Sequence, residues 1–120
     1  IGIEENPHAI EDAHINATTN NINNIEFFTG RVKNILKFNT FDAQGLVIDP
    51  PRSGMVPKAL KRILELNVQK ITYVSCNPTT LLRDLVLITE SGYKLTQFQP
   101  IDMFPHTYHM EIITTLEKIN

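Results

Sequence analysis

The most reactive side chain in this 120-residue sequence belongs to its single cysteine, Cys76. Cys76 follows an apolar, β-branched run that ends at Ser75, and it precedes Asn77-Pro78, which can begin a helix. Backbone N–H groups and the positive end of the helix dipole at such a junction favour the thiolate, the nucleophilic form of cysteine. A buried, unreactive cysteine is the alternative, and a lone cysteine without further signals favours it. The motifs elsewhere in the sequence therefore have to decide between the two.

A second candidate is the proline-containing motif Asp49-Pro-Pro-Arg-Ser-Gly54, which ends another apolar run. Neither proline can donate a hydrogen bond to a β-ladder, so the strand has to stop there. An acid followed by two prolines makes a rigid, extended loop that can present carbonyl groups and a carboxylate to a flat heterocycle or an adenosyl group. A turn with a solvent-exposed Arg52 is the alternative. We favour a binding loop, because two prolines, an arginine and a glycine exceed what a strand end requires.

The segment 102–111 concentrates aromatic, imidazole and acidic side chains, although only 8% of the whole sequence is aromatic. This clustering predicts a functional loop, and a tight turn with Phe104 in the core and solvated histidines is the alternative. His106 and His109 together with Cys76 would supply three zinc ligands. No fourth ligand has a suitable spacing, so we predict no metal site.

Composition and charge exclude several classes of protein. The length suits one domain, and 42% hydrophobic with 20% charged residues is typical of globular proteins. No run approaches the roughly 20 apolar residues that span a bilayer, and the start of the sequence does not resemble a signal peptide, so we expect neither membrane insertion nor secretion. A net charge of −2 argues against tight nucleic-acid binding by charge alone, but not against RNA as a substrate. The lone cysteine suits the reducing cytoplasm, where we expect the protein to reside.

Apolar, β-rich runs alternate with segments of helical periodicity, which predicts an α/β domain with a largely parallel sheet. The predicted strands are 1–4, 25–29, 45–49 and 71–75, and the predicted helices are 7–20, 56–66 and 78 to about 91. The runs 93–98 and 109–116 flank a loop that contains proline and predict an antiparallel pair at the end of the sheet. Ligands of open α/β sheets bind beyond the carboxyl ends of the strands, where we expect Glu4, Asp49 and Cys76.

Three motifs occur in order along the chain, together with two shorter matches near its start. They are Asp49-Pro-Pro-Arg-Ser-Gly54; Tyr73-Val-Ser-Cys-Asn-Pro78 with Thr80 and Arg83-Asp84; Asp102-Met-Phe-Pro-His-Thr107 with His109-x-Glu111; and, near the start, Gly2-Ile3-Glu4 and the helix that ends at Asn16-Ala17. In these residues the sequence resembles the C-terminal part of the S-adenosylmethionine-dependent RNA (uracil-5-)-methyltransferases, the tRNA and 23S rRNA 5-methyluridine enzymes.

The resemblance implies a Rossmann-like class I methyltransferase sheet, mostly parallel with an antiparallel end, of which this chain is the C-terminal portion. Residues 1–120 would form a partial S-adenosylmethionine-dependent methyltransferase domain, with the first strand and the glycine-rich loop of the family expected upstream of Ile1. A chain without that strand exposes a sheet edge, so we expect the isolated piece to be inactive and to self-associate.

The resemblance also implies roles for the reactive residues. Cys76 would be the nucleophile that adds to carbon 6 of uracil, and Glu111 the base that removes the proton from carbon 5. This division of labour makes chemical sense, because carbon 5 is a poor nucleophile until a thiolate has added to its neighbour. We further predict that Arg52, Phe104 and His106 bind the target base of the RNA substrate, which has to be turned out of its stack.

For the cofactor S-adenosylmethionine, the resemblance implies three contacts. Glu4 would bind the ribose, Asp49 would line the cofactor pocket, and Arg31 stands on the adenine side, where many relatives carry an acid or amide. The resemblance leaves open whether the RNA is tRNA or rRNA.

Two other functions remain possible from the residues alone. Acid-Pro-Pro loops also serve amino-group methyltransferases, but these usually carry an aromatic residue where Arg52 stands, and their chemistry has no task for Cys76. A non-catalytic module that binds RNA or a protein partner is the second alternative.

Overall fold

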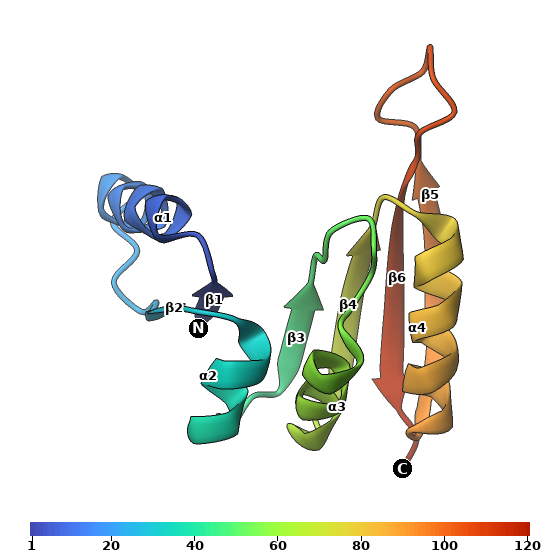
Figure 1. The fold of residues 1–120 in the computed structure, drawn as a ribbon, viewed down its shortest axis with the longest axis horizontal. Coiled ribbons are helices and arrows are strands. Elements are labelled where there is room, and N and C mark those ends of the chain that lie inside the picture. Colours follow the sequence, from blue (N-terminus) through green and yellow to red (C-terminus); the bar gives the residue numbers. More distant parts are fainter. The chain divides into compact units, whose positions relative to one another are not determined.

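The computed structural model describes residues 1–120, in which strands and helices alternate for most of the length of the chain (Figure 1). The strands are β1 (Gly2–Glu4), β2 (Phe27–Thr29), β3 (Gly45–Ile48), β4 (Lys70–Ser75), β5 (Tyr93–Ile101) and β6 (Glu111–Lys118). The helices are α1 (Pro7–Thr19), α2 (Val32–Phe38), α3 (Pro57–Glu65) and α4 (Pro78–Glu90). The chain divides into two compact units, Ile1–Thr40 and Phe41–Asn120. None of the helices has the length and apolar character that crossing a lipid bilayer requires.

The first unit is built on a two-stranded parallel sheet, in which Gly2 of β1 lies opposite Phe27 of β2. Helix α1 connects the strands and begins as its sequence predicts, because the Asn6 side chain accepts a hydrogen bond from the N–H of His8. The sequence analysis missed helix α2. This helix has only seven residues and no side-chain cap, and its apolar residues Val32, Ile35 and Leu36 are half-buried, so the helical signal in its sequence is short and weak.

The second unit contains a four-stranded sheet with the order β3-β4-β6-β5. β3 and β4 are parallel, whereas β6 is antiparallel to both β4 and β5, so β6 alone runs against the other three strands. This arrangement confirms the predicted class, an α/β fold whose mixed sheet carries an antiparallel pair. The sequence did not show that β6 lies between β4 and β5. β6 holds four buried side chains, Ile112, Thr114, Thr115 and Leu116, as expected of an interior strand.

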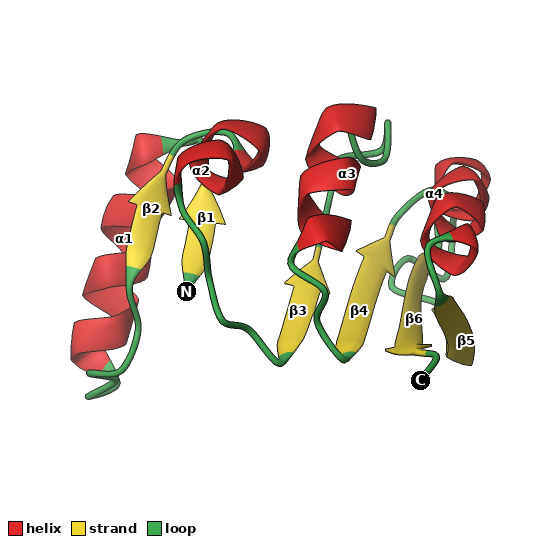
Figure 2. Cartoon of the chain, turned by 90° about the horizontal axis from the view of Figure 1, so that it is seen from below, coloured by secondary structure: helices red, strands yellow, loops and turns green.

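Helices α3 and α4 lie on the same face of this sheet (Figure 2). Helix α3 buries Ala59, Leu60 and Ile63, the amphipathic stripe that its sequence predicts. The buried positions of α4 also follow helical spacing, and they are Leu81, Asp84, Leu85 and Ile88. An aspartate thus occupies a position in the apolar stripe of α4, and its hydrogen bonds explain how the candidate site is held.

Candidate active site

A pocket of about 230 Å³ lies beside Cys76, within the second unit. Its walls come from the loop that follows β3, from the turn between β4 and α4, and from the segment that leads into β6. The lining residues are Arg52, Cys76, Phe104, Thr107, His109, Met110 and Glu111. Four of the residues singled out from the sequence, Cys76, Glu111, Arg52 and Phe104, are therefore brought to one pocket although they are far apart in the chain.

The turn that carries Cys76 is held by its neighbours on both sides. The hydroxyl of Ser75 accepts a hydrogen bond from the N–H of Asn77 and donates one to the Asn77 carbonyl, both at 3.0 Å. The Asn77 side chain then caps helix α4 by accepting a hydrogen bond from the N–H of Thr79. Cys76 is half-buried, so its thiol is neither sealed in the core nor fully exposed.

Glu111 reaches the same pocket through the pairing of β4 with β6. The last pair in this antiparallel ladder joins Ser75 to Ile112. Cys76 follows Ser75 in a bend, and Glu111 precedes Ile112 at the start of β6, so both lie at the same end of this ladder. Both residues also line the same pocket. The sheet thereby brings a thiol and a carboxylate together.

The segment between β5 and β6 forms a turn around Thr107. The N–H and the hydroxyl of Thr107 both donate to the Phe104 carbonyl, and the hydroxyl accepts from the N–H of His109. Phe104 is 56% exposed, so it does not belong to the core. His106, predicted as a base-binding residue, does not line the pocket, whereas His109 does. The signal that could have found His109 was its place in the motif His109-x-Glu111.

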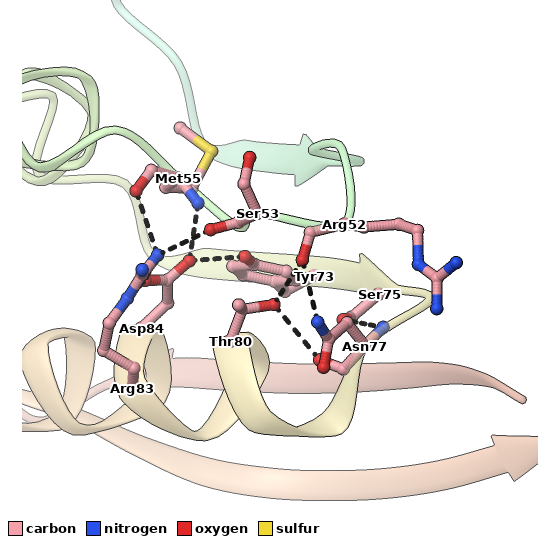
Figure 3. Close-up of polar contacts among 9 residues, drawn as sticks. All are labelled: Arg52, Ser53, Met55, Tyr73, Ser75, Asn77, Thr80, Arg83 and Asp84. Atoms are coloured by element: carbon pink, nitrogen blue, oxygen red, sulfur yellow. Dashed lines mark hydrogen bonds and ion pairs between the residues drawn. The ribbon is translucent and has the colours of Figure 1, made fainter.

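The loop between β3 and α3 carries Arg52, and helix α4 fastens it in place (Figure 3). The residues of α4 and its cap that do so are here called the loop clamp, and they are Asn77, Thr80, Arg83 and Asp84. The Arg52 carbonyl accepts hydrogen bonds from the Asn77 amide at 3.0 Å and from the Thr80 hydroxyl at 2.9 Å. The Arg83 guanidinium donates to the carbonyls of Ser53 and Met55, at 3.1 Å each.

Asp84 completes the loop clamp from inside the protein, where its side chain is 1% exposed. One carboxylate oxygen accepts from the N–H of Met55 at 2.7 Å and from the Tyr73 hydroxyl at 2.6 Å. The other oxygen accepts from Arg83 at 2.7 and 2.9 Å. A buried carboxylate is costly unless it is paired and hydrogen-bonded, and both conditions are met here. Burial, together with the hydrogen bond to the Asp84 carboxylate, raises the pKa of Tyr73 well above its ordinary value.

Gly54 shows how closely α4 approaches this loop. Its φ is +74°, and a Cβ added there would lie 2.6 Å from the Arg83 guanidinium and 2.8 Å from the Asp84 carboxylate. Only glycine fits both the backbone conformation and the space. The glycine of the Asp-Pro-Pro-Arg-Ser-Gly motif is therefore explained by residues of the second motif, Arg83 and Asp84.

The predicted cofactor contacts lie at the carboxyl ends of strands, where α/β sheets bind ligands. In the first unit, Glu4 ends β1, and one of its carboxylate oxygens accepts from the N–H of Asn6 at 2.8 Å. Arg31 lies between β2 and α2, and its guanidinium forms an exposed ion pair with Glu5 at 3.1 Å. In the second unit, Asp49 is the exposed residue that follows β3. Within its own unit, each of these two acids keeps acceptor capacity: one oxygen of Glu4, and the carboxylate of Asp49, accept no hydrogen bond from the protein.

Comparisons with known proteins agree with these motifs. A family model described as tRNA (uracil-5-)-methyltransferase matches residues 4–119. A protein of Caldanaerobacter subterraneus subsp. tengcongensis, described as an uncharacterized RNA methyltransferase, is 45% identical over 118 residues, which are 98% of this chain and 26% of that protein. A Listeria innocua protein of the same description is 44% identical over 118 residues, covering 96% of this chain and 26% of the relative. The chain thus spans about a quarter of the length of the curated relatives it matches.

Among solved structures, the chain resembles the Pyrococcus abyssi tRNA (uracil-54, C5)-methyltransferase in complex with S-adenosyl-L-homocysteine. The TM-score is 0.82 at 34% sequence identity, and the match covers 96% of this chain and 28% of that chain. An rRNA methylase from Streptococcus thermophilus, at 11% identity with a TM-score of 0.76, shares the fold.

Proposed function

The chain belongs to the tRNA (uracil-5-)-methyltransferase family, and from that premise we propose that it is the catalytic part of an enzyme that methylates carbon 5 of a uridine in tRNA or rRNA. The observation that carries the proposal is the pocket that Cys76 and Glu111 share. The two groups required by this chemistry, a nucleophile and a base, reach one small volume through the register of β4 and β6.

The reaction begins with the Cys76 thiolate. Its sulfur adds to carbon 6 of uracil, the C5–C6 double bond opens, and the electron pair moves toward the carbonyl at carbon 4 as an enolate. S-adenosylmethionine, when bound, supplies the methyl group that the activated carbon 5 takes up. Glu111 then accepts the proton from carbon 5, the double bond forms again, and the thiolate leaves carbon 6. Cysteine suits this sequence because its thiolate is both a good nucleophile and a good leaving group.

Other residues of the pocket would bind the target base. The ring of Phe104 offers a surface on which a pyrimidine can stack, and the Arg52 guanidinium can donate hydrogen bonds to its carbonyl oxygens. His106 lies on the same loop as Phe104 and would contact the RNA next to the base. The base has to leave its stack in the RNA before it reaches the thiol.

For the cofactor, the free oxygen of Glu4 fits the vicinal hydroxyls of a ribose, because a carboxylate accepts hydrogen bonds from both. Asp49 offers a second acceptor, and Arg31 a cation next to Glu5. The residues present therefore suit S-adenosylmethionine, the sulfonium form of the S-adenosyl-L-homocysteine bound by the Pyrococcus abyssi relative.

The test uses the full-length protein and RNA that contains 5-fluorouridine. Glu111 cannot remove fluorine from carbon 5 as it removes a proton, so the enzyme should remain covalently attached to the RNA through Cys76. We expect a complex that survives denaturing electrophoresis, and we expect Cys76→Ala to abolish it. An amino-group methyltransferase or a non-catalytic binding module would form no adduct that depends on Cys76, and that result would contradict the proposal.

A second variant tests the base. With ordinary uridine RNA, Glu111→Gln should add and methylate but fail to release, so the covalent complex should accumulate without fluorine. Glu117→Gln is the matched control, because Glu117 lies on the same strand six positions away and does not line the pocket. Free turnover by Glu111→Gln would overturn the role of Glu111.

A further inference from the structure

Arg52 lines the pocket although it belongs to a loop without regular secondary structure. Long arginine side chains on loops are mobile, and a group that binds substrate loses free energy if it has to be ordered on each encounter. Hydrogen bonds to the backbone of Arg52 reduce part of this ordering cost. The Arg52 carbonyl is bonded to Asn77 and Thr80, the first and fourth residues after Cys76.

These two hydrogen bonds tie the loop to the same turn that carries the thiol. The Asn77 side chain makes two contacts at once: its oxygen caps α4, and its amide group donates a hydrogen bond to the Arg52 carbonyl. The Thr80 hydroxyl donates to Arg52 from one helical turn further on. Moving the Arg52 carbonyl away from the turn that carries Cys76 therefore requires breaking the hydrogen bonds to Asn77 and Thr80.

The remaining part of the loop clamp secures the loop beyond Arg52. Arg83 and Asp84 bond Ser53 and Met55 at three backbone groups, and Asp84 does so from a buried position. Figure 3 shows the Arg52 side chain extending from the held backbone and away from Arg83 and Asp84. The clamp therefore leaves the guanidinium free while its Cα is held.

We propose that Asn77 and Thr80 are positioning residues that set the Arg52 guanidinium beside the Cys76 thiol. The inference deepens the proposed function and rests on it, since it assigns these residues to the same reaction site. A cation held at this place attracts anionic reagents to the thiolate and would favour the enolate formed on the pyrimidine. The charge at the thiol can be measured without RNA or cofactor.

The experiment compares alkylation of Cys76 by iodoacetate, an anion, with alkylation by neutral iodoacetamide. It uses the full-length protein, and mass spectrometry of the peptide that contains Cys76 gives both rate constants. Their ratio reports the local charge and cancels differences in thiol exposure. Arg52→Gln should lower the ratio about threefold, the factor expected for one unit charge at the edge of a solvated site.

The decisive variant is Asn77→Ser combined with Thr80→Val, which should lower the ratio toward that of Arg52→Gln. Serine can still cap α4, and valine has the shape of threonine without its hydroxyl. Thr80→Ser, which keeps the hydroxyl, should restore the ratio in the presence of Asn77. The matched control is Thr79→Val, because the hydrogen bond of Thr79 comes from its backbone N–H, which valine keeps, and this variant should keep the wild-type ratio. If the double variant does not fold, each single variant should lower the ratio part of the way.

Two results would overturn the proposal. In one, Arg52→Gln lowers the ratio and the double variant does not. In the other, Arg52→Gln itself has no effect, so no guanidinium lies beside the thiol. Failure of the proposed function would instead appear as a missing adduct with 5-fluorouridine RNA, a separate measurement that leaves the alkylation ratio unaffected.

Discussion

Tyr73 and Asp84 form a buried pair of polar side chains at the base of the loop clamp, with exposures of 0% and 1%. No buried polar side chain in the structure lacks a hydrogen-bond partner. The pair shows how the site is built, because a carboxylate inside the apolar face of α4 is tolerated only while its donors are in place. Removing one donor should therefore be measurable in the stability of the protein.

Tyr73→Phe should lower the free energy of unfolding by about 1.5–3 kcal/mol near pH 7, the range for a hydrogen bond to a charged group. Because folding raises the pKa of Tyr73, the stabilisation is complete below the unfolded value of about 10 and is lost as pH rises above it. Urea unfolding should thus show a shallower alkaline decline in the variant than in wild type. The control is Tyr108→Phe, since Tyr108 is 94% exposed. An unchanged stability of Tyr73→Phe would contradict this account.

Gly54→Ala should be more destabilising than Gly92→Ala. Both glycines have positive φ, +74° and +92°, so alanine strains both backbones by roughly 1 kcal/mol. An added Cβ at Gly92 meets nothing within 4 Å, whereas at Gly54 it meets the loop clamp. Overpacking typically costs a further 1–3 kcal/mol, which the difference between the two variants in chemical denaturation should report. Equal losses would mean that the loop moves away from α4 without cost.

Among the elements, strand β6 has the largest influence on the site. It runs against its neighbours and presents Glu111 one position beyond the last pair with β4. A shift of the register by one residue would turn Glu111 to the other face of the sheet. The burial of β6 prevents such a shift, because its apolar side chains would then leave the core.

The cross-strand pair Leu95 and Leu116 tests whether β6 is an interior strand. Leu116 on β6 is 0% exposed, and its partner Leu95 on the edge strand β5 is 43% exposed. Leu116→Ala should lose about 2–5 kcal/mol of stability in urea unfolding. Leu95→Ala, the matched control, should lose about 1 kcal/mol or less. Similar losses at both positions would argue against the strand order β4-β6-β5.

At the scale of the whole molecule, the buried hydrophobic side chains are unevenly divided between the two units. Ile10 is the one such residue in Ile1–Thr40, and all the others belong to Phe41–Asn120. A unit with few buried contacts and strands of three residues opens at low cost. The loop clamp and Cys76 belong to the second unit, which contains the larger core.

Hydrogen exchange followed by mass spectrometry should therefore show faster exchange of the amides in β1 and β2 than in β4 and β6. The strands of the second unit are longer, and β4 and β6 each have neighbours on both sides. Peptides from the two edge strands β3 and β5 provide the internal comparison. Equal protection in both units would contradict the uneven core. Self-association of the isolated chain stays a separate prediction, supported by the unpaired edge of β3 and by Val47, which is 71% exposed.

Local sequence determined most of the elements, because helix caps, prolines and apolar periodicity act within a few residues. Helices α1, α3 and α4 and strands β1, β3 and β4 lie within two residues of their predicted ends. The motifs also selected Cys76, Glu111, Arg52, Phe104 and His106 from sequence, and all of these except His106 line the pocket. Helix α2 was missed because it is only seven residues long and has no side-chain cap.

Only the tertiary structure decided how these residues meet. The position of β6 between β4 and β5, which brings Glu111 to the pocket beside Cys76, depends on pairing between segments about 35 residues apart in sequence, and no local pattern encodes it. The same holds for Arg83 and Asp84, whose partners in the loop after β3 are 28 to 30 positions away. Side-chain identity and periodicity are local properties, whereas a pocket is formed by contacts that exist once the chain has folded.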